Sequence, residues 1–156
     1  MTMQKRDVLQ YEDEFVSLYI NILNPYFEAF PERLVRTEGF ITSLRRGYFA
    51  EYVIREKSLY VTSLKRFIGF DREKKELIAE STLDIAFPNT KKCNFFSGWI
   101  ELNKHSKAAE AGNIKLIEIK NGDFVKELTL SKTEYKTLQE TTAYKDFEKK
   151  YSFMWY

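Results

Sequence analysis

The sequence predicts a mainly β fold with some helix: a curved antiparallel sheet or partly open barrel, with short helices and a C-terminal helical segment packed across it. Apolar and polar residues alternate along several segments, an Asn-Gly pair joins two of them, and a helix-start signal follows the last one. Aromatic residues favour half-buried pleated surfaces, and they make up 16% of the 156 residues. We expect most of them to pack in the core of a single domain that spans residues 1–156.

The N-terminal region is compatible with two structures. Its apolar residues have the spacing of a helix: Phe15, Leu18, Tyr19 and Ile22. Residues 8–11 and 15–19, which flank Glu12 and Asp13, also fit two short strands with a tight turn. We favour the hairpin, followed by a short helix over residues 26–30 that ends at Pro31.

The clearest strand covers residues 47–55. Alternate residues of this segment are apolar and predict one buried face: Tyr48, Ala50, Tyr52 and Ile54. Strands over residues 40–44 and 59–67 would complete an antiparallel meander. Residues 71–76 are almost wholly charged and predict a solvated loop or turn of helix, and residues 81–86 predict a brief helix.

The strongest hairpin signal is Asn121-Gly122, because both residues tolerate the positive φ of a type I′ turn. A two-residue turn here would place Lys120 opposite Asp123 and Ile119 opposite Phe124, between strands over residues 114–120 and 124–130. Another strand is predicted over residues 95–102, where Gly98 indicates a bulge or a close approach of the backbone.

The C-terminal segment begins with a capping box formed by Ser131 and Glu134. The apolar residues before and after Thr141-Thr142 fall on different helical faces, and paired threonines are unfavourable inside a helix. We therefore predict two helical segments rather than one straight helix.

Charge and cysteine content restrict the classes of protein that fit. The 25 basic and 23 acidic residues leave a net charge of +2 with the signs interspersed, so neither a nucleic-acid partner nor an anionic membrane is expected. Cys93 is the only cysteine, which fits a reducing compartment. The longest apolar stretch, residues 15–23, is too short and too interrupted for a membrane span, and no signal peptide is evident. We expect a cytoplasmic protein.

Few residues offer catalytic chemistry. A single histidine, His105, rules out a histidine-cluster metal site, and a solvent-facing loop position fits it better than a general base. A nucleophilic pair of Cys93 and His105 is conceivable, but Cys93 also fits an inert small apolar residue. No phosphate-binding glycine loop or nucleophile elbow occurs, so we expect no cofactor.

The candidate contact residues are basic and aromatic. Arg45 and Arg46 beside Tyr48 could bind a phosphate or stack on a base, although pairing of Arg36, Arg45 and Arg46 with nearby carboxylates explains the same pattern. Large aromatics also serve interfaces. The candidate interface or anion-contact residues are Arg45, Arg46, Tyr48, Trp99 and Trp155.

Two motif regions resemble a pattern in small uncharacterised bacterial β-rich proteins. In that pattern an Arg-Gly-Tyr strand, here residues 46–48, precedes a Leu-Tyr-Leu strand, to which Leu59-Tyr60-Val61 corresponds here. A Phe-Pro loop, here residues 87–88, then precedes an aromatic-Ser/Thr-Gly strand, here residues 96–98. The resemblance implies a β-rich fold, and some of these proteins are encoded near toxins.

Three classes of function fit the sequence. A non-catalytic protein-binding module that has another protein as its partner fits best, and its narrower form is an immunity protein that neutralises a toxin. The alternative is a small-molecule or nucleotide-binding domain, with aromatics at a barrel mouth and Arg45 or Arg46 as the anion anchor. An enzyme with dispersed carboxylates is the third class.

Overall fold

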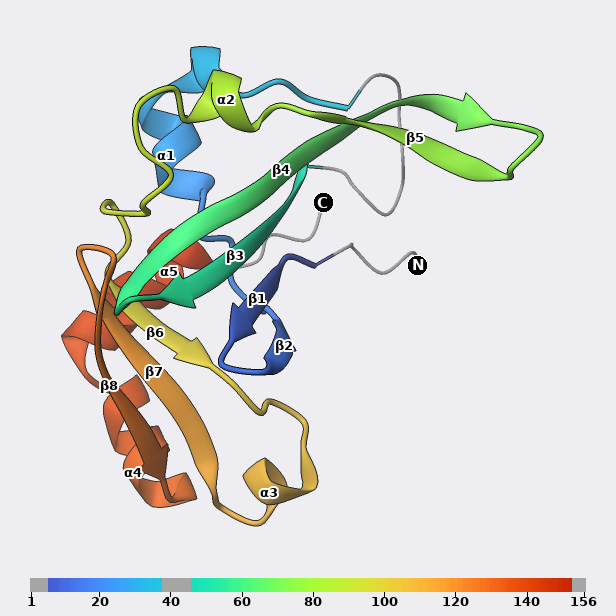
Figure 1. Cartoon of the computed structure of the whole chain (residues 1–156). Helices are drawn as coiled ribbons and strands as arrows, with labels where there is room; N and C mark the ends of the chain where they lie inside the picture. Colours follow the sequence, from blue (N-terminus) through green and yellow to red (C-terminus); the bar gives the residue numbers. More distant parts are fainter. Residues whose placement is uncertain (1–5, 38–45, 153–156) are drawn as a thin grey trace.

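The structure is a computed structural model that describes residues 6–37 and 46–152. Within these residues the fold is mainly β, as the sequence predicts, with eight strands in one open, unclosed sheet (Figure 1). The strands are β1 (Val8–Tyr11), β2 (Glu14–Ser17), β3 (Phe49–Arg55), β4 (Ser58–Asp71), β5 (Glu76–Ser81), β6 (Gly98–Glu101), β7 (Ile114–Lys120) and β8 (Asp123–Leu130).

The strand order is β2-β1-β3-β4-β8-β7-β6, and β5 pairs with β4. Only β1 and β3 run parallel among the described strands, so the sheet is mixed rather than wholly antiparallel. The link between β4 and β8 is a single pair, Ser58 with Asp123. In Figure 1, β3 and β4 on one side of this link diverge from β8 and β7 on the other side, so the sheet is strongly curved.

Short helices cover parts of the sheet. They are α1 (Asn24–Ala29), the 3₁₀ helix η1 (Pro31–Arg33), α2 (Leu83–Ala86), α3 (Lys107–Glu110), α4 (Lys132–Gln139) and α5 (Thr142–Tyr151). Helices α4 and α5 lie against the β6–β8 part of the sheet (Figure 1). None of the described helices is long and apolar enough to cross a membrane.

Local sequence signals account for two of the tight hairpins, β1–β2 and β7–β8. Strands β1 and β2 pair as the favoured N-terminal hairpin, with Tyr11 opposite Glu14. Strands β7 and β8 pair with Lys120 opposite Asp123 and Ile119 opposite Phe124, as predicted. Both turn residues of this second hairpin have positive φ, 50° for Asn121 and 80° for Gly122.

The two C-terminal helices begin with separate caps. The Ser131 hydroxyl accepts a hydrogen bond from the Glu134 N–H at 3.1 Å, and the Glu134 carboxylate accepts one from the Ser131 N–H at 3.0 Å. The Thr141 hydroxyl then caps α5 by accepting a bond from the Tyr144 N–H at 3.2 Å. This second cap separates α4 from α5 and confirms the prediction of two segments.

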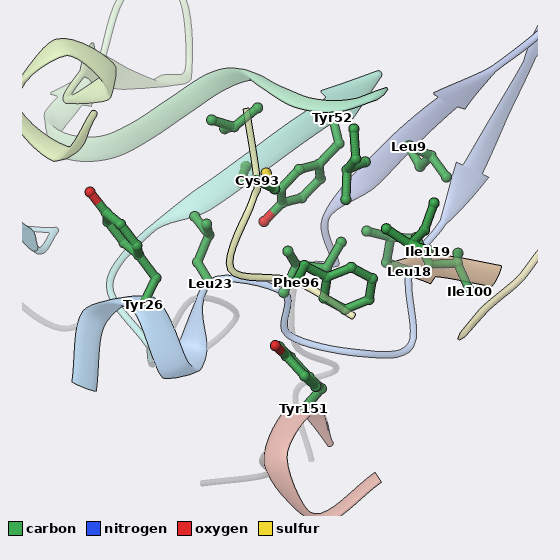
Figure 2. Packing of buried hydrophobic residues seen from close by; sticks show 14 of the residues in the cluster. Leu9, Leu18, Leu23, Tyr26, Tyr52, Cys93, Phe96, Ile100, Ile119 and Tyr151 are labelled. Carbon is green, nitrogen blue, oxygen red and sulfur yellow. The ribbon is translucent and has the colours of Figure 1, made fainter. Parts of the chain in front are cut away.

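The core lies between the sheet and the helices. In β3 the predicted alternation is present over its first part, because Ala50 and Tyr52 are buried and Glu51 is exposed, whereas Ile54 is only half-buried. The largest fully buried side chains come from strands, loops and α5, and several appear in Figure 2: Leu9, Leu18, Leu23, Tyr52, Phe96, Ile100 and Tyr151. A core assembled from distant segments ties the described chain into one unit.

Gly98 marks a close contact between sheet and helix. A Cβ atom added there would lie 2.2 Å from the ring of Phe147 in α5. The close backbone approach predicted at Gly98 is therefore present, although Gly98 begins β6 rather than lying in the middle of a longer strand.

The structure shortens the predicted solvated loop over residues 71–76 and adds a strand after it. Strand β4 runs on to Asp71, a turn follows, and β5 returns over Glu76–Ser81, so only the turn is the predicted solvated loop. The brief helix is confirmed as α2. The predicted strand over residues 40–44 lies outside the described residues.

Candidate functional site

Arg46 forms a buried ion pair with Asp7. The Asp7 carboxylate accepts bonds from both terminal nitrogens of Arg46, Nη1 at 2.9 Å, and from the Ala50 N–H at 2.8 Å. Tyr48 lies under the guanidinium, 4.6 Å from ring centroid to Cζ, and donates its hydroxyl proton to Asn21 at 2.7 Å. Only 1% of Asp7 and 7% of Arg46 is exposed. This network fastens the residue before β1 to the start of β3.

The other predicted basic and aromatic residues are distributed differently. Arg46 and Tyr48 border a hollow of about 270 Å³ together with the exposed Arg36. The Arg46 guanidinium points inward and pairs with Asp7. For this arginine the structure therefore shows pairing with a carboxylate, the alternative to anion binding that the sequence left open. Arg45 and Trp155 lie outside the described residues.

Cys93 and His105 do not form a catalytic pair. Cys93 is fully buried beside Tyr52 (Figure 2), and burial raises the pKa of its thiol well above the ordinary value. His105 is exposed in the loop after β6, with its ring 5.5 Å from that of Tyr19. Because the thiolate is the nucleophile, a buried neutral thiol that no substrate reaches cannot act as one. Within the described residues, no group of histidine, cysteine and acidic side chains is arranged to hold a metal ion.

Trp99 projects from β6 towards α5. Its ring lies 5.4 Å from that of Tyr144 and 5.5 Å from that of Phe147. Half-buried there, it borders a cleft of about 540 Å³ between the sheet and the C-terminal helices. Of the predicted contact residues that the structure describes, Trp99 alone combines partial exposure with a cleft of this size.

Several exposed apolar side chains gather on a hairpin that extends beyond the rest of the sheet (Figure 1). We call it the arm, residues 66–81: the end of β4, the turn and β5 (Figure 1). Half of the large apolar side chains that are strongly exposed in the described chain belong to it. They are Ile68, Phe70, Leu77 and Ile78, which are 37%, 54%, 43% and 43% exposed.

Both faces of the arm carry these side chains. Phe70 lies directly opposite Leu77, and their side chains share one face because paired residues in adjacent strands point the same way. Ile78 points to the other face, opposite Gly69, which has no side chain of its own to cover it. A hairpin with apolar groups on both faces cannot bury them all against its own sheet.

The outer edge of the arm offers backbone groups to a further strand. Within the part of the chain that the structure describes, β5 pairs with β4 alone, and all of its residues are exposed. The face that bears Ile78 also carries the acidic residues Glu76 and Glu80. Glu76 lies opposite Asp71, and Glu80 pairs with Arg66 at 3.3 Å. The edge is therefore apolar at its centre and acidic on either side.

The sequence contained a signal for the arm. Phe70 and Leu77 flank a charged segment of a length that suits a hairpin turn, residues 71–76. The alternation of polar and apolar residues is weak in Leu77-Ile78-Ala79 because both faces are exposed, so the sequence pattern alone predicts no strand there.

Comparisons with protein-family models, with curated proteins and with solved structures found no match. The arm and the cleft beside Trp99 are therefore the observations on which a function can be argued.

Proposed function

We propose that this chain is a non-catalytic protein-binding module that docks with another protein through its arm, residues 66–81. The observation that carries the proposal is the exposure of Phe70, Leu77 and Ile78 on both faces of a projecting hairpin. Full burial of one such side chain contributes about 1.5–3 kcal/mol, and roughly half of each remains exposed. A partner that covers them gains binding energy without any rearrangement of the core.

The partner we propose supplies an extended strand to the free edge of β5. Main-chain hydrogen bonds along this edge give affinity, and side-chain contacts at alternate positions give specificity. The acidic residues Glu76 and Glu80 flank Ile78, so basic residues that flank an apolar one suit the partner strand.

A second copy of this chain suits the edge less well. Antiparallel pairing of two β5 strands about Ile78 would place Glu76 of each copy opposite Glu80 of the other. Like charges directly opposite each other destabilise a strand pair, and this register is the one that aligns the apolar residues. The charge pattern therefore favours a different protein.

In its narrower form the proposal makes the partner a toxin and this chain its cytoplasmic immunity protein. The support for this form is the resemblance of residues 46–48 and 96–98 to motifs of bacterial proteins, some of which are encoded near toxins. A protein that acts by masking a surface requires an exposed docking element and no catalytic group.

Photo-crosslinking tests the proposal. A benzophenone amino acid at Leu77 in the arm should give a discrete crosslinked product in the native cells, whereas the same group at Phe15 in β2, which is 75% exposed, is the matched control. The product should decrease when Phe70→Ser is added, because that side chain shares the docking face. No product from Leu77, or equal products from both positions, would contradict the proposal.

Two further measurements separate the possible partners. The purified chain alone should be a monomer at micromolar concentration, and a dimer that crosslinks through Leu77 would show that the partner is a second copy. For the toxin form, co-expression with the neighbouring gene product should rescue growth with the wild-type chain but not with Phe70→Ser/Leu77→Ser. Failure of the wild-type chain to rescue growth and to co-purify would remove that form.

A further inference from the structure

The cleft beside Trp99 is the second feature with the properties of a binding site. It lies between β6 and β7, the segment after β2, the loop that holds His105, and helices α4 and α5. Its volume of about 540 Å³ falls in the range of pockets for small molecules. Pockets of this kind combine apolar walls with a few polar groups that fix the orientation of the ligand.

A cationic cluster occupies one part of the cleft. Arg6 and Lys104 both face the ring of Tyr19, with the Arg6 Cζ at 4.2 Å and the Lys104 Nζ at 4.8 Å from its centroid. The His105 ring meets the same ring edge-on. The backbone of His105 has a φ of 65°, an uncommon conformation for a residue other than glycine. These groups give the cleft several donors suited to an anionic group.

An acidic and hydroxyl-bearing cluster occupies another part. The hydroxyls of Tyr135 and Tyr144 lie 3.2 Å apart. Burial is the largest cause of the raised pKa of Tyr135, and the neighbouring Tyr144 phenol and the Glu101 carboxylate raise it further. Burial, together with the Glu148 and Glu101 carboxylates, also raises the pKa of Tyr144. Both phenols therefore stay protonated at neutral pH, beside carboxylates that accept hydrogen bonds.

An aromatic wall completes the cleft. Trp99 is half-buried, packs on Tyr144 and Phe147, and lines the cleft. A flat ring in the ligand can stack on such a surface, and the stacking of a base on an aromatic side chain contributes about 1–3 kcal/mol.

We propose that this cleft binds a nucleoside monophosphate, with its phosphate at Arg6, Lys104 and His105, its base against Trp99, and the N–H groups of the base donating to Glu101. The mixture of cations, carboxylates and aromatic rings matches a ligand with one anionic group and one planar ring that bears donors. Of the common bases, guanine presents two adjacent N–H donors to a carboxylate, so guanosine 5′-monophosphate should bind most tightly. This site is separate from the arm and does not depend on it.

Titration of Trp99 fluorescence tests binding. The chain has two tryptophans, so Trp155→Phe leaves Trp99 as the only indole reporter. The 5′-monophosphates of guanosine, adenosine, cytidine and uridine are added in turn to this variant. A saturable change that is tightest for guanosine 5′-monophosphate is expected. No saturable change with any of the four would overturn the proposal.

Substitutions test how the two parts of the ligand are recognised. Lys104→Ala should weaken guanosine 5′-monophosphate binding about tenfold and leave guanosine binding unchanged, because only the nucleotide carries the charged group. Lys126→Ala, an exposed lysine on β8 that does not border the cleft, is the matched control. Equal effects of the two variants, or inorganic phosphate binding as tightly as the nucleotide, would contradict the proposal.

Glu101→Gln isolates recognition of the base. The variant keeps the size of the side chain, but its amide cannot accept two parallel N–H donors as a carboxylate does. The preference for guanosine 5′-monophosphate over the adenosine form should fall at least severalfold, with an unchanged thermal midpoint. A wild-type chain that binds all four nucleotides equally, or an unchanged preference in the variant, would overturn the assignment of Glu101 and the proposed pose.

Discussion

The first half of β4 and its second half, in the arm, carry similar side chains in different surroundings. Leu59, Val61 and Leu64 are at most 1% exposed, whereas Ile68 and Phe70 further along the same strand are 37% and 54% exposed. The first half pairs with β3 and faces the core, while the second half pairs with β5 beyond the rest of the sheet (Figure 1). Apolar residues in a strand become core only where a second layer covers them.

The proposed function gives the two halves of β4 different tasks. In the body of the protein, burial of apolar residues contributes to folding stability. In the arm, the same residue types leave apolar area that becomes buried only when another molecule covers it. Substitutions in the body should therefore lower stability, and substitutions in the arm should lower binding.

The largest loss of stability is expected from the ion pair in the body. Asp7→Ala removes the carboxylate that pairs with the buried guanidinium of Arg46, which is 7% exposed. Loss of one partner of a buried ion pair costs about 3–5 kcal/mol. Urea denaturation measures the change, and Asp13→Ala, in the exposed turn of the β1–β2 hairpin, is the control that should stay within about 0.5 kcal/mol. Equal effects of the two would show that the Asp7 network does not hold the N-terminal segment.

A pair of glycines gives the next comparison. Gly98→Ala forces a methyl group against Phe147 in the body, 2.2 Å from the ring, and overpacking of this kind costs about 1–3 kcal/mol. Gly69→Ala in the arm meets only the Ile78 Cδ1 at 3.8 Å, an ordinary contact. The stability of the Gly69→Ala variant should therefore differ from that of the wild type by less than about 0.5 kcal/mol in thermal denaturation. A destabilised Gly69→Ala variant would mean that the arm packs more tightly than its exposure indicates.

A smaller loss than at Gly98 is expected at the surface of the body. Ser131→Ala removes the hydroxyl that caps α4 and should cost about 1 kcal/mol. Hydrogen bonds from Ser131 lower the pKa of Glu134, and the bond from the backbone N–H contributes more than the bond from the side chain. A carboxylate with a lowered pKa stabilises the fold above its unfolded-state pKa, and this contribution is lost as the pH falls through the folded-state pKa.

The pH dependence gives a separate readout of that cap. The stability difference between wild type and Glu134→Gln should be greatest at neutral pH and should shrink at a pH below the ordinary glutamate pKa of about 4.3. Denaturant midpoints at both pH values measure it, with Glu140→Gln at the other end of α4 as the control. A difference that is constant with pH would contradict the role of the Glu134 carboxylate.

The parts of the fold that follow from local chemistry could be predicted from the sequence. The Asn121-Gly122 turn, the alternation in β3 and the two helix caps each depend on residues close together in the chain. Strand β5 could not be predicted from alternation, because both of its faces are exposed and neither is distinguished by burial.

The candidate site depended on contacts between distant residues. Arg46 was a candidate anion contact, but its partner Asp7 lies 39 positions earlier and takes up the guanidinium in the interior. Trp99 was also a candidate, yet the basic residues that share its cleft come from the N-terminus and from the loop after β6. Only the fold brings Arg6 and Lys104 to the same ring of Tyr19.

The most direct test of the account compares two substitutions in β4 by urea denaturation. Leu64→Ala, in the core, should lower the free energy of unfolding by about 2–5 kcal/mol. Phe70→Ala, in the arm, should change it by less than about 0.5 kcal/mol. A loss of 2 kcal/mol or more at Phe70, on the order of a core truncation, would show that the arm contributes to folding stability and contradict its assignment as a docking surface.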